Sequence, residues 1–342
     1  MNKLLTRDEF RESVFERDDH KCIICHEPAK DAHHIMERRL FHDGGYYLDN
    51  GASLCHAHHL QAEMTLISTN ELREVIGIQK VILPEHLYDD QEYDKWGNII
   101  LPNGSRLKGE LFFDESVQKI LDQGNVLDLF TDKVKYPRTY HLPWSEGMYD
   151  DDDRILSSTK VFENKRVIVT EKMDGENTTL YWDYIHARSL DSQNHESRNW
   201  VKNFWSQIAH DIPIGWRICG ENLFATHSIK YESLKTYFYG FSIWDEKNIC
   251  LSWDDTLFWF DLLGITPVPI LYDDVYDEEK IRQLWCKLNP TYNEGYVLRL
   301  ADEFSFFDFK KCVGKFVRKN HIQTVKHWMY GQKIETNKIK GE

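Results

Sequence analysis

The stretch Glu171-Lys172-Met173-Asp174-Gly175-Glu176-Asn177 decides how this chain is interpreted. It follows the apolar, β-branched run 166–170, which predicts a buried strand. Lys172 therefore lies at the end of a strand, and Gly175 lets the backbone approach a ligand closely. A lysine attacks the α-phosphate of a nucleotide only when its amine is neutral, and burial beside other cations lowers its pKa towards that state. We predict that Lys172 is a nucleophile that faces a cleft.

Five further segments follow this stretch, and their order along the chain is informative. They are a cationic segment (186–189), a strand ending near an acid (216–222), an aromatic strand (237–245), a strand opening with an acid (293–298) and a basic strand (314–320). Each alone is a weak signal, because K-x-D-G recurs by chance and strand-end acids or aromatic residues are often ordinary surface or core residues. Six such segments in this order favour lysine nucleotidyl-transfer chemistry.

This series resembles the ordered motifs of the covalent nucleotidyltransferases, the superfamily of ATP-dependent ligases and capping enzymes. Within that superfamily, residues from about 137 to 330 resemble the nick-sealing RNA ligase branch. The resemblance implies an α+β nucleotidyltransferase fold, with antiparallel sheets and flanking helices around a nucleotide cleft. The short remainder after residue 320 leaves no room for the OB domain found downstream in DNA ligases and capping enzymes, which favours the RNA ligase branch.

The resemblance also implies a role for each matching residue. Lys172 would form lysyl-AMP, with Asp174, Glu294 and Lys315 as the other catalytic residues. Lys315 would neutralise the triphosphate and Glu294 would bind a divalent metal or a nucleotide oxygen. The nucleotide-binding residues would be Glu171, Lys172, Arg188, Glu221, Phe241, Glu294, Lys315, Arg318 and Lys319.

Three of these roles concern the nucleoside and the incoming strand. Arg188 would hold the ribose and the 5′-phosphate, Glu221 would accept from a ribose hydroxyl, and Phe241 would stack on adenine. One departure from the family pattern concerns the basic strand. The usual spacing is lysine, one residue, lysine, but position 317 is Val, so Arg318 or Lys319 must substitute, and the sequence does not choose between them.

A second pattern lies near the start of the chain. Cys22-Ile23-Ile24-Cys25 is followed thirty residues later by Cys55-His56-Ala57-His58. A C-x-x-C paired with a C-x-x-H has the ligand types and spacing of a tetrahedral zinc site. The predicted structural zinc ligands are Cys22, Cys25, Cys55 and His58.

Residues from about 5 to 65 resemble the HNH nuclease family, a ββα-metal unit carried on a zinc knuckle. The resemblance implies that His34 is a general base, that His33 and His59 bind a catalytic divalent ion, and that Asn50 orients the loop carrying the base. Cleavage stays an open question, because a fold can persist as a nucleic-acid clamp after its chemistry is gone.

Length and composition set the organisation. A chain of 342 residues predicts about two domains. We expect an HNH-like zinc domain at 1–80, a linker or accessory segment at 81–136, and the ligase domain at 137–342. Between the two patterns, Gln61 to Lys80 reads as one helix, Asn103-Gly104 as a hairpin turn, and Asp114 as a helix cap.

The net charge of −14 argues against attraction of nucleic acid by the whole protein, so any attracting field must be local. No apolar run reaches membrane-spanning length, no signal-peptide core follows Met1, and the cysteines outside the zinc pattern are scattered singly. We therefore expect a cytoplasmic protein without a membrane or an obligate protein partner.

The sequence thus predicts an ATP-dependent RNA ligase that uses ATP, Mg²⁺ or Mn²⁺, and Zn²⁺. It would join a 5′-phosphate to a 3′-hydroxyl through lysyl-AMP and adenylylated RNA, on nicked duplexes or broken ends, with the HNH-like module aiding substrate binding. Two alternatives remain: a ligase for DNA or RNA–DNA hybrid nicks, and a bifunctional HNH endonuclease with an attached repair ligase. The physiological RNA and the oligomeric state are not specified.

Overall fold

The structure is a computed structural model that describes residues 3–89, 91–147, 154–190, 194–289, 291–319 and 334–341. The chain forms two compact units, residues 1–134 and residues 135–342. Residues 81–134 of the expected linker or accessory segment, 81–136, therefore fall within the first unit, and residues 135–136 fall within the second. No helix in these described ranges combines the length and the apolar character needed to cross a membrane.

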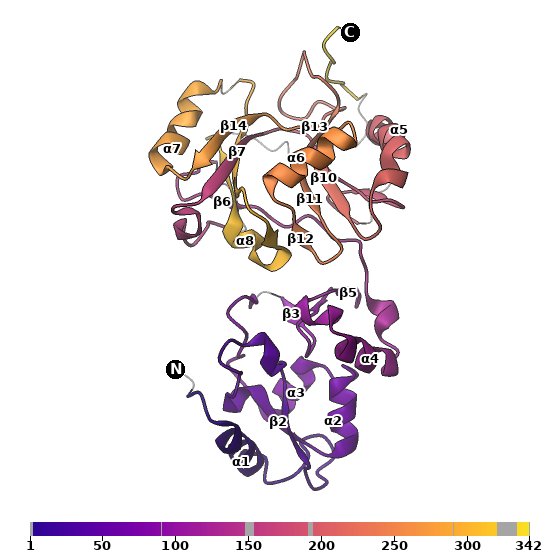
Figure 1. Cartoon of the computed structure of the whole chain (residues 1–342), viewed down its shortest axis with the longest axis vertical. Coiled ribbons are helices and arrows are strands. Elements are labelled where there is room, and N and C mark those ends of the chain that lie inside the picture. Colours follow the sequence, from indigo (N-terminus) through magenta and orange to yellow (C-terminus); the bar gives the residue numbers. More distant parts are fainter. Residues whose placement is uncertain are drawn as a thin grey trace. The chain divides into compact units, whose positions relative to one another are not determined.

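The first unit is built from short elements (Figure 1). Its helices are α1 (Arg7–Arg17), α2 (His56–Glu63), α3 (Thr69–Ile76) and α4 (Glu115–Gln123), and its strands are β1 (Asp31–His34), β2 (Gly51–Leu54), β3 (Glu92–Tyr93), β4 (Ile99–Ile100) and β5 (Arg106–Leu107). Strand β1 pairs with β2, and β3, β4 and β5 form a second antiparallel sheet. The hairpin expected at Asn103-Gly104 connects β4 to β5, and Asp114 caps α4.

The single helix expected over Gln61–Lys80 is wrong. Helix α2 ends at Glu63, and α3 begins at Thr69. Between them Thr65 adopts a positive φ of 59°, which no α-helix contains. Ser68 then caps α3 by accepting from the Glu71 amide, while the Glu71 side chain accepts from the Ser68 amide. This capping box starts a new helix and was readable in the sequence as Ser68-x-x-Glu71.

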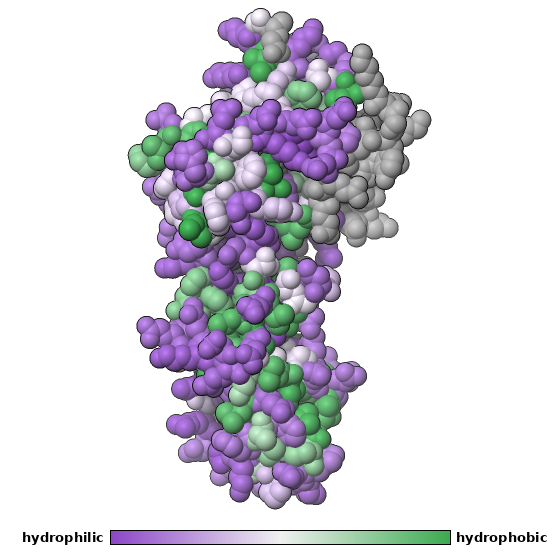
Figure 2. Space-filling model, turned by 90° about the vertical axis from the view of Figure 1, so that its right-hand side faces the viewer, coloured by the Kyte–Doolittle hydropathy of each residue, from purple (hydrophilic) through white to green (hydrophobic). Residues whose placement is uncertain are grey.

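Two small groups of buried apolar residues hold the first unit together. The group beside the Cys/His pattern consists of Cys22, Ile35, Ala52, Leu54, Cys55, Ala62 and Leu72. The other is formed by Trp96, Phe112, Val117, Leu121 and Val126, all from the former linker segment. Hydrophobic residues are also frequent on the surface of this unit in the view of Figure 2.

The second unit contains two mainly antiparallel sheets. One has the order β16-β12-β11-β10-β8-β9, with β13 paired to β11, and the other has the order β14-β7-β15-β17-β6. The strands are β6 (Tyr140–His141), β7 (Arg166–Lys172), β8 (Glu176–Leu180), β9 (Ile185–Ala187), β10 (Arg217–Asn222), β11 (Phe238–Trp244), β12 (Ile249–Cys250), β13 (Thr266–Pro267), β14 (Ile270–Val275), β15 (Gly295–Leu300), β16 (Phe304–Ser305) and β17 (Val313–Val317).

Four helices flank these sheets: α5 (Asn199–Ile208), α6 (Trp253–Leu262), α7 (Glu278–Lys287) and α8 (Phe309–Cys312). Ser252 caps helix α6 by accepting from the Asp255 amide, and Gly264 follows the end of the helix with a positive φ of 66°. Together the helices and sheets form the mixed α and β architecture that the sequence predicts for residues 137–342.

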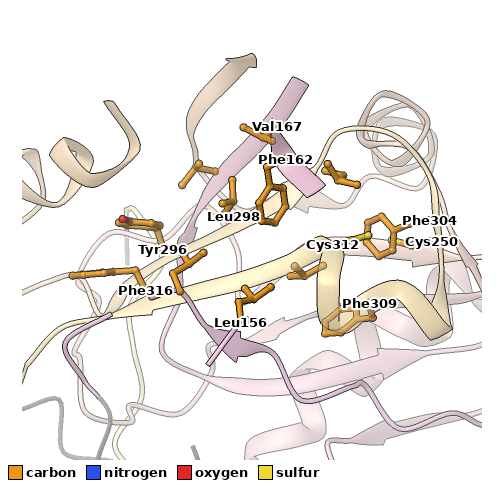
Figure 3. Close-up of a cluster of buried hydrophobic side chains, with 14 of the residues drawn as sticks. Leu156, Phe162, Val167, Cys250, Tyr296, Leu298, Phe304, Phe309, Cys312 and Phe316 are labelled. Carbon is orange, nitrogen blue, oxygen red and sulfur yellow. The ribbon is translucent and has the colours of Figure 1, made fainter. Parts of the chain in front are cut away.

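The largest core of the second unit lies on one face of the β14-β7-β15-β17-β6 sheet (Figure 3). Alternation along β15 sends Tyr296, Leu298 and Leu300 into this core and leaves Val297 and Arg299 on the opposite face. That opposite face lines a cavity, so the core fixes the strands that carry the candidate site.

Candidate nucleotide site and metal centres

A cavity of about 560 Å³ opens in the second unit, with walls from both sheets. Most of the residues expected to bind nucleotide line it: Glu171, Lys172, Asp174, Gly175, Arg188, Glu221, Phe241, Glu294 and Lys315. These residues are spread over 145 positions in the sequence, from 171 to 315. The cavity has the size of a small-molecule site.

Lys172 lies at the last position of β7, where the sequence placed it. Its Nζ donates to Glu294 Oε2 over 2.7 Å, and the side chain is 27% exposed. The pairing of β7 with β15 brings these residues together, because Lys172 is opposite Gly295 in the register. The pairing of β7 with β15 thus holds Lys172 beside Glu294.

The pKa of Lys172 is shifted in the direction opposite to the sequence expectation. Burial favours the neutral amine, but the charges of Glu294 and Glu221 outweigh it, so the pKa of Lys172 is raised. The expected neighbouring cations are outnumbered by carboxylates in the protein without nucleotide or metal. The amine is therefore a protonated partner of Glu294 in this state.

Glu221 completes the acidic surroundings. Burial is the main cause that raises its pKa to about 8; Lys172 opposes the shift, and the charges of Glu294 and Asp174 add to it. Glu221 Oε1 accepts from the Gly175 amide over 3.2 Å. A Cβ at position 175 would lie only 2.6 Å from the Asn222 carbonyl oxygen, so glycine is needed there for close approach rather than for a positive φ.

Aromatic side chains form part of the cavity wall. Phe241 of β11 is partly buried, and its ring meets that of Tyr136 edge to face with centroids 5.1 Å apart. Phe241 also packs against the core residues on both sides of the cavity. Phe241 therefore packs in the core and also lines the cavity. The sequence allowed either an ordinary core residue or a stacking residue.

Cations line the cavity from several strands. Lys315 of β17 and Arg188 after β9 were expected, and Arg138 lines the cavity as well. Burial first, and then the charge of Arg138, lowers the pKa of Arg188. Neither Arg318 nor Lys319 is among the described cavity residues, and the Arg318 amide donates to the Glu294 carbonyl oxygen over 3.0 Å.

Sequence reasoning missed the loop between β10 and β11, residues 223–237, which we call the wall loop. Its His227 and Ser228 line the cavity. The Ser228 and Ile229 amides donate to Asp174 Oδ2 over 2.8 and 2.7 Å, and the Asp174 amide donates to the Tyr231 hydroxyl over 3.0 Å. Backbone donors carry no sequence signature, so no residue pattern could have shown these contacts.

In the first unit, the four predicted zinc ligands converge. Their donor atoms all lie within 4.8 Å of one another. Cys25 Sγ and Cys55 Sγ are 3.7 Å apart, and His58 Nδ1 is 3.4 Å from Cys22 Sγ and 3.3 Å from Cys55 Sγ. Zinc–sulfur bonds of roughly 2.3 Å in a tetrahedron place donors about 3.5–3.8 Å apart. The donor set therefore fits zinc.

A second cluster in this unit joins His33 and His59 to a residue that the sequence analysis did not name, Glu63. Glu63 Oε1 lies 3.3 Å from His33 Nδ1 and 3.4 Å from His59 Nε2. A signal was available, because Glu63 lies one helical turn after His59 and shares its face of α2. Burial lowers the pKa of His33 to about 3, so this imidazole is neutral, as a metal ligand must be.

Lys95 contributes a charge to this cluster that was also not foreseen. Its ammonium is 3.1 Å from Glu63 Oε1 and 3.1 Å from Glu37 Oε2, and it donates to the His34 carbonyl oxygen over 3.2 Å. Burial raises the pKa of Glu63, but its hydrogen bonds from His33 and His59 and the charge of Lys95 outweigh that effect and lower it. Glu63 is therefore a carboxylate.

His34 and Asn50 occupy the positions expected to matter for an HNH-like site. His34 stacks on Phe10 with ring centroids 4.5 Å apart and lines a cavity of about 420 Å³ that also contains His33, His59 and Glu63. No described residue forms a hydrogen bond with His34 Nε2. Asn50 accepts from the Met36 amide and donates to the Met36 and Gly45 carbonyl oxygens, which fixes the loop after β1.

Residues 165–317 match the model of the RNA ligase family. No curated protein matches the chain. Among solved structures, it is similar to a mutant RNA ligase of Naegleria gruberi with ATP and Mn, at 19% identity over 53% of this chain and 57% of that chain, with a TM-score of 0.34. The same organism's RNA ligase with PPi gives 17% identity over 80% and 72%, with a TM-score of 0.40. The chain thus spans little more than half of the first of these ligases.

Proposed function

We propose that this protein is an ATP-dependent RNA ligase whose nucleophile is Lys172. The observation that carries the proposal is the convergence of Lys172, Glu221, Phe241, Glu294 and Lys315 on one cavity, within the segment that matches the RNA ligase family. A lysine, acids, an aromatic ring and a further cation in one cavity are what transfer of a nucleotide to an amine requires.

The reaction would run in three balanced steps. Lys172 Nζ, after losing a proton, forms a bond to the α-phosphorus of ATP, and pyrophosphate leaves with the electrons of the broken P–O bond. The RNA 5′-phosphate oxygen then displaces Lys172 from AMP. Finally an RNA 3′-hydroxyl displaces AMP and forms the phosphodiester. Lys315 and Arg188 are placed on the cavity wall to neutralise charge on the phosphates.

The acidic residues of the cavity fit a divalent cation. Glu221 and Glu294 face the same cavity, and the pKa of Glu221 is raised first by burial and then by the charges of Glu294 and Asp174. Magnesium or manganese held by these carboxylates would supply the charge that screens them from Lys172 and from the nucleotide phosphates.

Incubation with α-labelled ATP and a divalent metal tests the nucleophile. We expect wild-type protein to form a covalent adduct that persists after denaturation. Lys172→Ala should form none, and Lys172→Arg should also fail, since a guanidinium remains protonated. Lys280→Ala is the matched control, because Lys280 is an exposed lysine of α7 that pairs with Asp277 outside the cavity. An adduct on the alanine variant would refute the assignment of Lys172.

The nucleic acid and the nucleotide need separate measurements. Sealing of matched nicks in RNA, DNA and hybrid duplexes compares the RNA ligase with the DNA or hybrid ligase, since the cavity residues named above recognise nucleotide and phosphate. Adduct formation with GTP equal to that with ATP would move the protein towards the capping enzymes.

For the first unit, we propose a zinc-stabilised, HNH-like module that binds the nucleic-acid substrate. The cluster Cys22, Cys25, Cys55 and His58 would hold the zinc. The His33, His59 and Glu63 cluster beside His34 also favours a second function, metal-dependent strand cleavage, with His34 as general base.

Two variants distinguish a nuclease from a binding module. A nuclease would cut RNA or DNA with magnesium, manganese or nickel, and His34→Ala would stop cleavage without affecting the adduct at Lys172. A binding module would show no cleavage, and deletion of residues 1–65 would weaken substrate binding and sealing. We favour the binding module, because an uncontrolled nuclease would reopen the strands that the ligase joins.

A further inference from the structure

Residues 334–341, which we call the clasp, pack along the wall loop of the second unit. The clasp and the loop are joined by two β-bridges, Ala225 with Thr336 and Leu234 with Ile339. Backbone hydrogen bonds follow the same line, from the Thr226 amide to the Glu335 carbonyl at 2.8 Å and from the Leu234 amide to the Lys338 carbonyl at 2.9 Å. The clasp therefore supplies partners to a loop that contains no helix or strand of its own.

Asn337 is the central residue of the clasp. It is 1% exposed, and its side-chain amide forms hydrogen bonds with the start and the middle of the wall loop. Its Oδ1 accepts from the Tyr231 amide at 2.9 Å and from the Thr226 hydroxyl at 3.0 Å. Its Nδ2 donates to the Leu223 carbonyl at 2.8 Å and to the Ala225 carbonyl at 3.3 Å. One buried side chain thus fixes the start and the middle of the loop.

The opposite side of the wall loop meets the turn that follows Lys172. Asp174 Oδ2 accepts from the Ser228 and Ile229 amides, and the Asp174 amide donates to the Tyr231 hydroxyl. Hydrogen bonds to a carboxylate are about twice as strong as those between neutral groups. Tyr231 links the clasp to Asp174, since its amide donates to Asn337 and its hydroxyl accepts from the Asp174 amide.

Apolar packing follows the same path. Met173, between Lys172 and Asp174, belongs to a buried cluster with Leu223 and Leu234 of the wall loop, and Ile339 of the clasp packs against it. The clasp therefore contacts the loop through hydrogen bonds and through a shared core, and the loop contacts the residues directly after the nucleophile.

We propose that Asn337 is a positioning residue for nucleotidyl transfer: it fixes the wall loop, and the loop fixes Asp174 and the turn that sets the position of Lys172. This inference rests on the proposed function of the cavity. It adds a residue 165 positions from Lys172 that does not line the cavity and that the nucleotide motifs do not contain.

The test compares single-turnover adduct formation from α-labelled ATP in the wild type, Asn337→Ala and Asn337→Asp. We expect the rate at saturating ATP to fall roughly 10- to 100-fold in both variants, since small displacements of a reacting group cost rates of that size. Lys340→Ala is the control, because its side chain is exposed and its backbone contact to Leu234 remains. An unchanged rate in Asn337→Ala, or an equal fall in Lys340→Ala, would overturn the proposal.

Hydrogen exchange shows whether the effect passes through the loop. In Asn337→Ala, the amides of Ser228 and Ile229 should exchange faster while those of β7 keep their protection. A slower reaction without faster exchange in the loop, or one accompanied by loss of protection in β7, would contradict a positioning role.

A double-mutant cycle with Tyr231→Phe gives an independent readout. That variant removes the hydroxyl that accepts from the Asp174 amide. If Asn337 acts through the same loop, the double variant should be slower by less than the product of the two single effects, whereas independent effects would multiply. Absence of an adduct in the wild type would instead overturn the proposed function, and with it the role of the clasp in that reaction.

Discussion

The two units of this chain use different means to stay folded. In the second unit, large aromatic and aliphatic side chains such as Phe162, Tyr296 and Trp244 are completely buried. In the first, the group of buried apolar residues beside the Cys/His cluster includes two of the cluster's own thiols, Cys22 and Cys55. If the Cys/His cluster holds zinc as proposed, the contrast teaches that the first unit combines apolar packing with a metal cross-link, whereas the second unit is supported by its cores alone.

The largest expected effect comes from breaking that cross-link. Cys55→Ser, or removal of metal by a chelator, should unfold the first unit, since structural zinc contributes on the order of 10 kcal/mol to folding of small domains. Elemental analysis should find one zinc in the wild type, and hydrogen exchange should show loss of protection in β1 and β2 but not in β7. Cys286→Ser, at an exposed cysteine of the second unit, should change neither. A zinc-free wild type with a folded first unit would contradict the comparison.

The matching change in the second unit is Leu298→Ala. Leu298 is completely buried in the largest core, and its truncation should lower the free energy of unfolding of this unit by about 2–5 kcal/mol. Denaturant unfolding with exchange readout for each unit measures this. Ile214→Ala removes a side chain that is 76% exposed, and it should be nearly neutral. An equal loss for both variants would mean that the core does not dominate.

A smaller effect is expected from a polar residue of the first unit. Asn50→Ala removes three buried hydrogen bonds to Met36 and Gly45, which should cost about 1–3 kcal/mol because the partners are left unpaired. The measurement is the stability of the zinc-loaded protein. Glu12→Ala, on the exposed side of α1, is the control. A loss as large as that of Cys55→Ser would show that the loop, rather than the metal cluster, holds this unit.

The smallest effect concerns an ion pair on the second unit. Arg166 binds Asp254 and Asp273, but its side chain is 42% exposed, so Arg166→Met should change the unfolding free energy by less than about 1 kcal/mol. Arg166 lowers the pKa of Asp254, so the contribution is present above about pH 4 and is lost as pH falls below it. Stability that responds to this variant at pH 3 as much as at pH 7 would contradict this account.

Much of the second unit could be predicted from the sequence because the residues proposed to act in the cavity lie at the ends of apolar strands. Lys172 follows an apolar run, and Glu294 precedes another, so hydrophobic periodicity alone placed both at strand ends. The 2.7 Å contact between them could not be predicted, since register between distant strands is set by side-chain packing. The raised pKa of Lys172 follows from that contact and was missed for the same reason.

In the first unit, fixed spacing identified Cys22, Cys25, Cys55 and His58, because a metal site imposes its spacing on the sequence. The contacts of Lys95 could not be predicted, since the surrounding sequence contains no motif that distinguishes it from a solvent-exposed lysine. Ser68 and Glu71 form a capping-box pattern that indicates the start of α3. The apolar pattern across residues 61–80 nevertheless favoured a single helix. Asn337 had no signal at all: its importance comes from backbone groups of the wall loop.

The clasp has a consequence for how the protein is made. A chain is synthesised from its amino-terminal end, and units fold as they emerge. Lys172 and the wall loop leave the ribosome before residues 334–341, and until then the loop lacks the partners that Asn337 provides. Until residues 334–341 have emerged as well, the nascent protein would therefore present Lys172 in an incompletely shaped cavity.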